Sequence, residues 1–156
     1  MIWINHIENY PPCSDQPPGK DLNYTNIVTS FLKNDDQILI LKRSNKVKSM
    51  KNLWAGISGI IEKDDQSPLS RAEIEIFEET GIKREQTNLL KESQQMKIIS
   101  AQYKNHEWNI FPFLFKVENP EIKLNWENSE FEWVKPSNIV NYKTVPSLDK
   151  ILFNLL

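Results

Sequence analysis

The sequence predicts an α+β fold, with helices in an α+β or α/β/α arrangement around a mixed β-sheet, on three observations. First, strand-like apolar runs alternate with one central helix-like segment at residues 68–80 and one closing helix-like segment at residues 144–156. Second, 156 residues are a single-domain length that can bury a hydrophobic core. Third, 39% hydrophobic and 26% charged residues are typical of a globular chain and exclude a disordered or fibrous one.

Residues 1–22 are predicted to form a proline-rich arm, and residues 23–156 the folded domain. The arm holds four prolines, which favour extended or turning chain. Its Cys13 is the one cysteine of the sequence, so an internal disulfide is excluded and a reducing cytoplasm is expected. Cys13 has no neighbouring partners for nucleophilic work, so we expect no catalytic role for it. The N-terminus lacks the basic and apolar segments of a signal peptide, and no apolar run approaches the roughly 20 residues of a membrane span.

The first half of the domain predicts a hairpin followed by a third strand. Residues 27–32 and 37–42 are strand-like, residues 34–36 form the turn, and the apolar run predicts burial on both faces. Arg43 emerges at the end of this hairpin, and the preferred interpretation is an ordinary solvated strand end. Residues 54–61 form the next strand, whose glycines permit close backbone approach.

Two more strands are predicted beyond the central helix, at residues 96–103 and 108–117, after a polar connection at residues 83–92. Pro112 lies inside the second of them and indicates an edge or bulge position, because proline cannot donate a ladder hydrogen bond. His106 falls in the turn between the two strands. An exposed turn histidine is the preferred interpretation over a metal or catalytic role.

The end of the chain predicts a short strand at residues 131–134, a helical turn from Pro136 and the closing helix at residues 144–156. The closing helix would present one apolar stripe: Val145, Leu148, Ile151, Leu152 and Leu155.

The central helix has clear start and stop signals. Ser67 can cap its first turn, Pro68 suits the first helical position, and Gly81 suits the left-handed residue just past the end. The sequence therefore predicts a helix from Pro68 to about Thr80.

Three glutamates share one face of this helix, because Glu75, Glu78 and Glu79 stand at i, i+3 and i+4. Their mutual repulsion and the helix dipole at this end both disfavour anions, so a cation is the natural compensation. The window 62–79 holds seven acidic and two basic residues, a balance of −5 against −2 for the whole chain. Hard oxygen ligands in this number suit Mg²⁺ or Mn²⁺, and the alternative is a solvated acidic helix face.

The stretch from Gly59 to Ile82 resembles the Nudix box. The family form is Gly, five residues, Glu, seven residues, then Arg-Glu-hydrophobic-x-Glu-Glu-x-Gly-hydrophobic. The match is close from Glu75 to Ile82. Before that the loop has one extra residue, Gln66 stands for the first Glu of the box, and Ile74 stands for its Arg. Arg71, four residues before Glu75, could supply the missing charge from the preceding turn.

The resemblance implies a Nudix sandwich and a metal-dependent pyrophosphohydrolase using Mg²⁺ or Mn²⁺. The predicted metal and catalytic residues are Glu75, Glu78 and Glu79, with the backbone carbonyl of Ser58 also reaching the metal. In the family a fourth carboxylate comes from a distant loop, and Glu127 is the first choice for this ligand or base, with Glu130 second. Supporting roles fall to Gly59, Arg71 and Gly81.

Two residues are predicted to contact substrate. Basic residues at the position of Arg43 often face substrate phosphates in Nudix-like chains, since Arg can hold phosphate oxygens in a bidentate way. Trp126 is the aromatic residue most expected to be exposed and to stack on a base, whereas Trp54 is expected in the core.

Three functions compete on this sequence. The leading one is hydrolysis of the diphosphate linkage in a nucleoside diphosphate linked to another moiety. The second is a catalytically weak Nudix-fold nucleotide-binding protein or sensor, and the third is an isopentenyl-diphosphate isomerase relative, for which Cys13 is poorly placed. Without a basic cluster, the net charge of −2 argues against nucleic acid as a partner. The expected partner is a small nucleoside diphosphate derivative. A homodimer is a possible assembly, and no binding to a membrane is expected.

Overall fold

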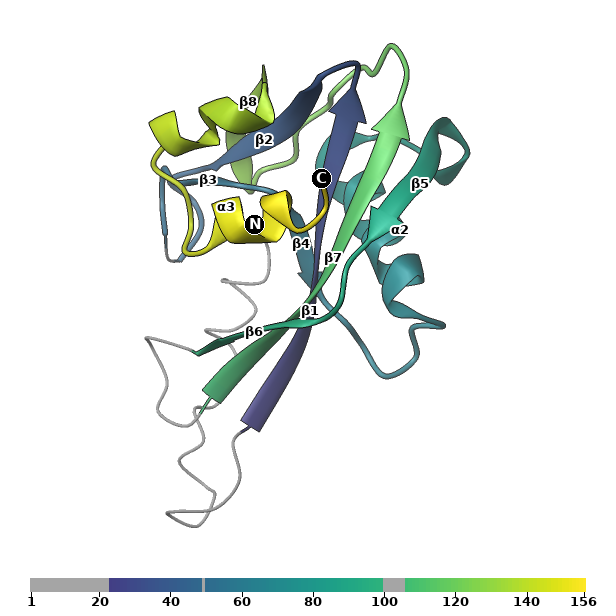
Figure 1. Ribbon diagram of the computed structural model, residues 1–156, viewed down its shortest axis with the longest axis vertical. Helices are drawn as coiled ribbons and strands as arrows, with labels where there is room; N and C mark the ends of the chain where they lie inside the picture. The colour runs from purple at the N-terminus through teal and green to yellow at the C-terminus, as the bar shows by residue number, and fades with distance from the viewer. Residues whose placement is uncertain (1–22, 49, 100–105) are drawn as a thin grey trace.

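The computed structural model describes residues 23–48, 50–99 and 106–156. The proline-rich arm predicted for residues 1–22, including Cys13, lies outside these ranges, as do residues 100–105, which include the end of the strand predicted at residues 96–103. Eight strands of the described chain form one mixed sheet (Figure 1). They are β1 (Asn23–Asn34), β2 (Gln37–Arg43), β3 (Trp54–Ala55), β4 (Ile57–Ile60), β5 (Thr87–Glu92), β6 (Met96–Ile99), β7 (His106–Val117) and β8 (Asn128–Val134).

Strand β1 is the centre of the sheet. It pairs antiparallel with β2 and β4, and parallel with β7 along almost its whole length. Strand β2 carries β3 and β8 as antiparallel partners, and β7 carries β5 and β6. The predicted hairpin is confirmed, because β1 and β2 meet through the turn at residues 34–37.

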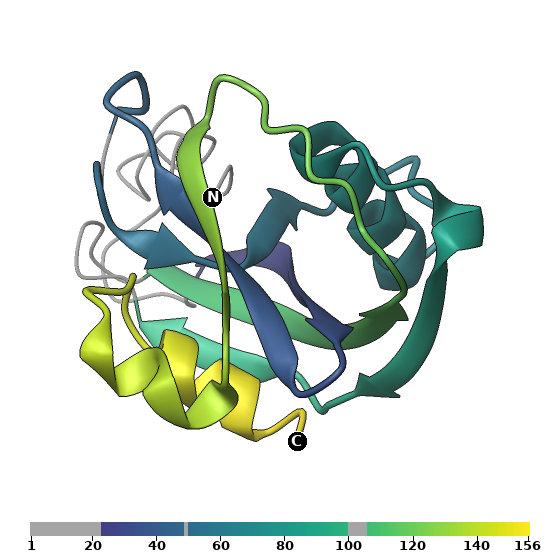
Figure 2. The ribbon, with the colours of Figure 1, turned by 90° about the horizontal axis from the view of Figure 1, so that it is seen from above.

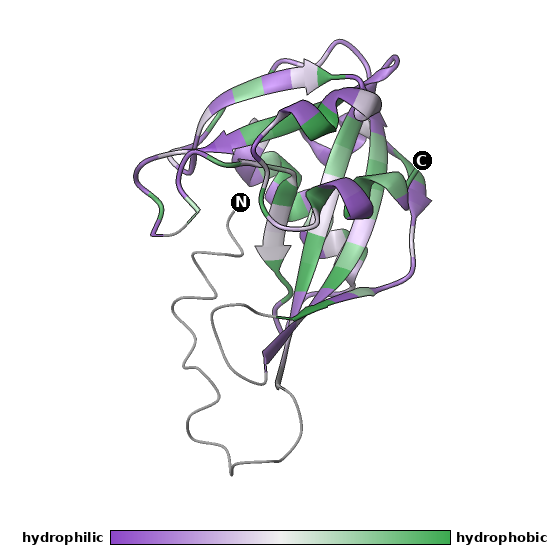
Figure 3. Cartoon of the chain, turned by 60° about the vertical axis from the view of Figure 1, so that its left-hand side comes forward, coloured by the Kyte–Doolittle hydropathy of each residue, from purple (hydrophilic) through white to green (hydrophobic). Residues whose placement is uncertain are grey.

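Two helices cover opposite faces of this sheet, which confirms the predicted α/β/α sandwich. Figure 2 shows α2 (Pro68–Thr80) on one face and α3 (Leu148–Phe153), beside the 3₁₀-helix η3 (Pro136–Asn141), on the other. Alternate residues of β1 feed the two cores: Ile27 and Phe31 pack on the α3 side, and Val28 and Leu32 on the α2 side. The apolar strands run through the middle of the molecule, with polar residues in the connections (Figure 3).

The strand predicted at residues 54–61 is two strands that pair with different neighbours. β3 pairs with β2, and β4 pairs with β1, so the chain crosses from one to the other at Gly56. A Cβ at Gly56 would lie 3.2 Å from the carbonyl oxygen of Ser30. Glycine is therefore used here for close approach, as the sequence predicted.

The polar connection predicted at residues 83–92 is wrong. These residues form the 3₁₀-helix η2 (Arg84–Gln86) and the edge strand β5. The strand was missed because only Thr87 is partly buried and the rest of β5 is exposed. β5 is a strand because it pairs with β7. Since its side chains are not buried, its sequence shows little alternation of hydrophobic and polar residues.

Pro112 does not mark an edge strand, because β7 lies between β1 on one side and β5 and β6 on the other. The carbonyl of Pro112 accepts a 3.3 Å hydrogen bond from the Ser93 N–H, in the short break between β5 and β6. The missing N–H of proline faces the same break, where no ladder hydrogen bond is lost.

His106 is buried at the start of β7, so the predicted exposed turn histidine is wrong. Its Nε2 lies 2.8 Å from the Thr25 hydroxyl oxygen, and its ring centroid lies 4.1 Å from that of Trp108. Burial lowers the pKa of the imidazole. The parallel pairing of β1 with β7, which places Asn23 opposite His106, explains this burial and is not encoded locally.

The closing helix is shorter than predicted, although its apolar stripe is buried as expected. Val145 instead donates its N–H to the carbonyl of Trp54, at 3.0 Å. Pro146 disfavours helical geometry at the residue before it, and Ser147 adopts a left-handed φ of 65°. The helix therefore begins at Leu148.

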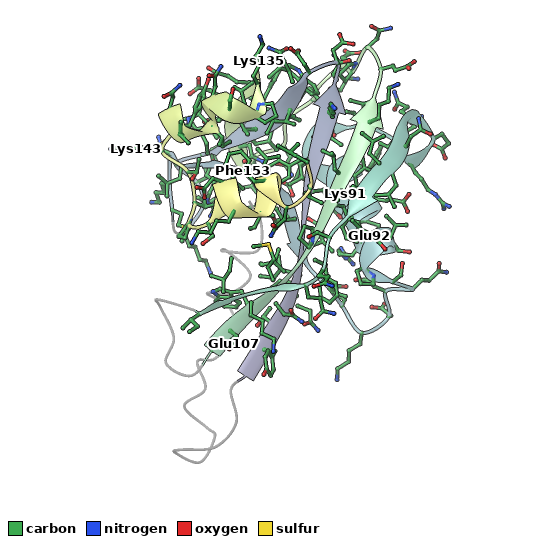
Figure 4. All side chains as sticks on the ribbon, viewed as in Figure 1. Lys91, Glu92, Glu107, Lys135, Lys143 and Phe153 are labelled. Carbon is green, nitrogen blue, oxygen red and sulfur yellow. The ribbon has the colours of Figure 1, made fainter. Side chains whose placement is uncertain are left out.

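The exposed side chains of Lys135 and Lys143 lie beyond the two ends of η3, and the partly buried Glu107 lies near the start of β7 (Figure 4). Among the described residues, no helix has the length and apolar character needed to cross a membrane.

Candidate active site

Helix α2 carries the site and has the predicted ends. The Ser70 N–H donates to the Ser67 hydroxyl at 3.1 Å, and Pro68 occupies the first turn. Gly81 has a φ of 77° and donates its N–H to the Phe77 carbonyl at 2.9 Å. These local caps fix where the glutamates fall on the helix.

The three glutamates of α2 differ in burial. Glu75 and Glu79, one turn apart, are 2% and 0% exposed and point into the protein, while Glu78 is exposed. Glu78 is still close enough for its charge to raise the pKa of Glu75. The solvated acidic face is therefore wrong for Glu75 and Glu79.

Gly59 on β4 makes room for Glu75. A Cβ at Gly59 would lie 2.3 Å from Cδ and 2.6 Å from Oε2 of Glu75, which is closer than non-bonded atoms approach. The first glycine of the box is therefore required by the carboxylate that packs on it. Ser58, just before it, is fully buried, and its hydroxyl oxygen lies 2.9 Å from that of Thr29. The metal contact of the Ser58 carbonyl stays a prediction.

We expect Gly59→Ala to keep the fold and to displace Glu75, because the clash falls on the end of a flexible side chain. Divalent-ion affinity and kcat should both fall. The matched control is Gly56→Ala, whose new methyl meets a carbonyl oxygen at 3.2 Å and not Glu75. Calorimetric Mn²⁺ titration measures the difference, and equal Mn²⁺ affinity in the two variants would contradict the assignment.

Arg71 contacts Glu75 from the preceding turn, as the sequence suggested. Its Nη1 donates to Glu75 Oε2 at 3.0 Å. Its Nε and Nη2 donate to the two oxygens of Asp65, both at 2.8 Å. Ile74, in the box position of the arginine, is 42% exposed on the outer side of α2. It lies with Gln66 and Phe77 in a depression of about 840 Å³.

Glu127 is brought to α2 by the loop that precedes β8. It is buried, and its Oε1 accepts a hydrogen bond of 3.2 Å from Asn125. The next residue, Asn128, donates through Nδ2 to Glu79 Oε1 at 3.3 Å. Glu130, the second choice, is exposed and forms an ion pair with Lys42 at 3.2 Å. The structure thus brings Glu127, and not Glu130, to the helix.

Burial controls the electrostatics of this cluster. It raises the pKa of Glu75 to about 8, with a further rise from Glu78 and an opposing effect from the Arg71 hydrogen bond. Burial also raises the pKa of Glu79 well above its ordinary value, and it raises the pKa of Glu127. Glu75 Oε1, Glu79 Oε2 and Glu127 Oε2 have no hydrogen-bond partner among the described residues.

These three oxygens fit a divalent cation by their chemistry, because buried carboxylate oxygens need a charged partner. No three His, Cys, Asp or Glu side chains in the described ranges are already gathered at metal-ligand spacing. The three carboxylates therefore suit a divalent cation by their oxygen donors, their burial and their lack of hydrogen-bond partners, although they are not already arranged as a complete set of ligands.

The two predicted substrate contacts have different environments. Arg43 is fully buried, so the preferred interpretation of a solvated strand end is wrong. Its Nε donates to the Met50 carbonyl at 3.1 Å, and its charge partly opposes the rise that burial causes in the pKa of Glu127. Trp126 is 56% exposed as predicted, and Trp54 is in the core.

Sequence reasoning missed Asp65, Asn125 and Asn128. The acidic loop at residues 62–65 was a signal for Asp65, since it precedes a helix that carries an arginine at a reachable spacing. Asn125 contacts Glu127 within the same loop, whereas the contact of Asn128 with Glu79 depends on the pairing of β2 with β8.

Comparisons with known proteins identify the family of this chain. The sequence matches the family model of the NUDIX domain over residues 23–155. The chain therefore belongs to the NUDIX domain family, and the family supports the predicted enzyme class, a Nudix-type pyrophosphohydrolase. No curated protein matches the sequence.

Three solved structures illustrate the shared fold. The MutT protein from Methanosarcina mazei Go1 has a TM-score of 0.67 and 21% identity, covering 86% of this chain and 94% of that chain. An Ap4A hydrolase from C. elegans has a TM-score of 0.65 and 15% identity, covering 85% and 94%. The NUDIX domain of Shewanella oneidensis NrtR, complexed with ADP ribose, has a TM-score of 0.63 and 14% identity, covering 99% and 96%.

Proposed function

We propose that this protein is a metal-dependent hydrolase that cleaves the diphosphate linkage of a nucleoside diphosphate linked to another moiety. The observation that carries the proposal is the set of three buried, unmatched carboxylate oxygens on Glu75, Glu79 and Glu127. Such a set is costly without a cation and suits the divalent ions that Nudix hydrolases generally need.

The residues have distinct roles in this proposal. Glu75, Glu79 and Glu127 would hold Mg²⁺ or Mn²⁺, with Glu78 at the exposed edge and the Ser58 carbonyl as a further oxygen ligand. The ion, when bound, would neutralise phosphate charge and lower the pKa of a bound water. Arg71 holds Glu75 in place through its 3.0 Å contact. Glu127 Oε2 would either hold the ion or, in the alternative role of base, accept a proton.

Relatives of the same fold support the substrate class. One is an Ap4A hydrolase, and another NUDIX domain is complexed with ADP ribose. Ap4A and ADP ribose each contain a nucleoside attached to phosphates that are joined by an anhydride bond. Trp126 has the exposure needed to stack on a base. For Arg43, we propose that its charge acts on phosphate from beneath the surface, beside Glu127.

A second candidate function is nucleotide binding with little or no turnover. It is favoured by Gln66 and Ile74, two departures from the box that both line the outer side of α2. The sequence-based expectation of a cytoplasmic location and a possible homodimer is compatible with either function.

A substrate panel separates the two functions. ADP-ribose, NADH, dinucleoside polyphosphates, nucleoside triphosphates and sugar nucleotides are incubated with the protein and Mg²⁺ or Mn²⁺, and products are separated by chromatography. Turnover of one class, abolished by chelator and strongly lowered in Glu79→Gln, is expected. Tight binding of a panel member without hydrolysis would favour the second function.

We expect Glu127→Gln to lower kcat by tenfold or more, about 1.4 kcal/mol, while KM changes little. The reason is that glutamine keeps the side-chain size but removes the charge that would act on the ion or the water. Glu130→Gln is the matched control, because Glu130 is exposed and its one ion pair within the described part of the chain is with Lys42. An unchanged kcat in Glu127→Gln would assign the role to another residue.

A further inference from the structure

We propose that Asp65 is a positioning residue, which acts through Arg71 on Glu75 and so sets the divalent-ion affinity of the carboxylate cluster. The inference rests on the proposed function, in which Glu75 is a metal ligand. Asp65 has no other role assigned by the box, where the neighbouring residue Gln66 takes the aligned position.

The guanidinium of Arg71 donates hydrogen bonds unequally to two carboxylates, those of Asp65 and Glu75. Asp65 takes two parallel hydrogen bonds, from Nε and Nη2, both at 2.8 Å. Glu75 takes one, from Nη1 at 3.0 Å, through Oε2. Two-point contacts fix the plane of a guanidinium, so Asp65 decides where the third N–H points.

Asp65 is itself held by the backbone. Its Oδ2 accepts the Glu62 N–H at 2.7 Å, and its own N–H donates to the Glu62 carbonyl at 3.1 Å. The side chains of Asp65, Arg71 and Glu75 are only 6%, 11% and 2% exposed. The contacts from Asp65 through Arg71 to Glu75 are therefore shielded from water, and a tight turn holds Asp65 in place. The ion pair of Arg71 with Glu62, at 3.4 Å, involves an exposed carboxylate and constrains Arg71 less.

This arrangement leaves one oxygen of Glu75 for a ligand. Because Arg71 reaches only Oε2, Glu75 Oε1 has no hydrogen-bond partner among the described residues. Without the anchor at Asp65, Arg71 could form a two-point pair with Glu75 itself. Such a pair would occupy both oxygens and compete with the cation.

The test measures Mn²⁺ binding by calorimetry, with Mn²⁺ alone and no substrate. Asp65→Asn should weaken Mn²⁺ binding by fivefold or more, since a neutral amide cannot hold the guanidinium as a carboxylate does. The matched control is Asp64→Asn, which removes the same charge from an adjacent, exposed residue. The control should change the affinity by less than twofold.

A double-mutant cycle identifies the route. Asp65→Asn placed in an Arg71→Ala background should add less than a twofold change, because Asp65 acts only through Arg71. The inference would be overturned if Asp65→Asn and Asp64→Asn changed the Mn²⁺ affinity equally, or if the wild type did not bind Mn²⁺. It would also be overturned if Asp65→Asn weakened Mn²⁺ binding by the same factor with and without Arg71. Should Asp65→Asn fail to fold, Arg71→Lys replaces it in the test. Lysine keeps the positive charge but lacks the planar guanidinium that makes the two-point contact, so Mn²⁺ binding should weaken by a similar factor.

The two proposals fail separately. A wild type that binds Mn²⁺ with the expected Asp65 dependence, but hydrolyses no panel member, would leave the inference standing and refute the hydrolase. Hydrolysis with an Asp65→Asn variant that binds Mn²⁺ as the wild type does would refute the inference alone.

Discussion

Replacing Glu79 with glutamine should lower kcat by about 100-fold or more, roughly 2.7 kcal/mol of transition-state stabilisation. Glu79 is completely buried and presents Oε2 without a hydrogen-bond partner in the described chain, so its charge is the group most dependent on a bound cation. Glutamine keeps the contact with Asn128 through its amide oxygen but removes the negative charge.

The same substitution should stabilise the metal-free protein at high pH. Burial raises the pKa of Glu79 above its ordinary value of 4.5. Between the unfolded and folded pKa values the folded state binds more protons than the unfolded state, so the free energy of unfolding falls as the pH rises. This loss begins near pH 4.5 and continues to the raised pKa. Glu79→Gln removes it, and the gain should therefore be larger at pH 8 than at pH 5.

Thermal unfolding with and without Mg²⁺ checks this prediction. Wild type should gain stability from Mg²⁺, by about 2.7 kcal/mol at 100 times the dissociation constant, and Glu79→Gln should gain much less. Equal Mg²⁺ shifts in the two proteins would remove Glu79 from the metal site. The exposed Glu130 provides the control, because Glu130→Gln should shift with Mg²⁺ as the wild type does.

Replacing Arg71 with alanine should lower kcat/KM by tenfold or more, about 1.4 kcal/mol, whereas Ile74→Arg should gain little. Arg71 donates a 3.0 Å hydrogen bond to Glu75, and we propose that this contact replaces that of the box arginine. Ile74 is 42% exposed, and Arg71 already donates a hydrogen bond to Glu75, so a second arginine should add little. Ile74→Arg should also cost little stability, since few apolar contacts are lost.

Steady-state kinetics on an accepted substrate decide between two accounts of the altered box. Arg71→Ala with wild-type kcat/KM, or a large gain of activity in Ile74→Arg, would mean that the site lacks its arginine. Because removing Arg71 leaves Asp65 and Glu75 buried without their cation, unfolding must be measured alongside. Arg71→Lys keeps the positive charge but loses the two-point contact of the guanidinium, so it separates these two contributions. It should retain stability better than Arg71→Ala.

Local sequence determined the box helix and its immediate setting. Ser67, Pro68 and Gly81 fix the ends of α2 through hydrogen bonds and backbone angles within a few residues of each end. The 3.6-residue period then determines that Glu75 and Glu79 lie one turn apart, with Arg71 one turn before. The same local character gave the first hairpin and the apolar stripe of α3.

Only the tertiary structure decided which charges are buried. Glu127 and Asn128 lie close to Glu79 although 48 or more positions separate them in the sequence. They do so because β8 pairs with β2 and brings the preceding loop to α2. The same pairing, with its bulge between Lys42 and Arg43, accompanies the burial of Arg43, which the sequence predicted to be solvated.

The sheet likewise decided the positions that the sequence misjudged. The parallel pairing of β1 with β7 buries His106, and the break between β5 and β6 accommodates Pro112 inside the sheet. Asp65 meets Arg71 because a tight turn folds the loop back on the helix. Helix ends and hairpins depend on hydrogen bonds between near neighbours and can be predicted from the residues themselves. Burial of a charge depends on which distant strands pair, and no short stretch of sequence contains that information.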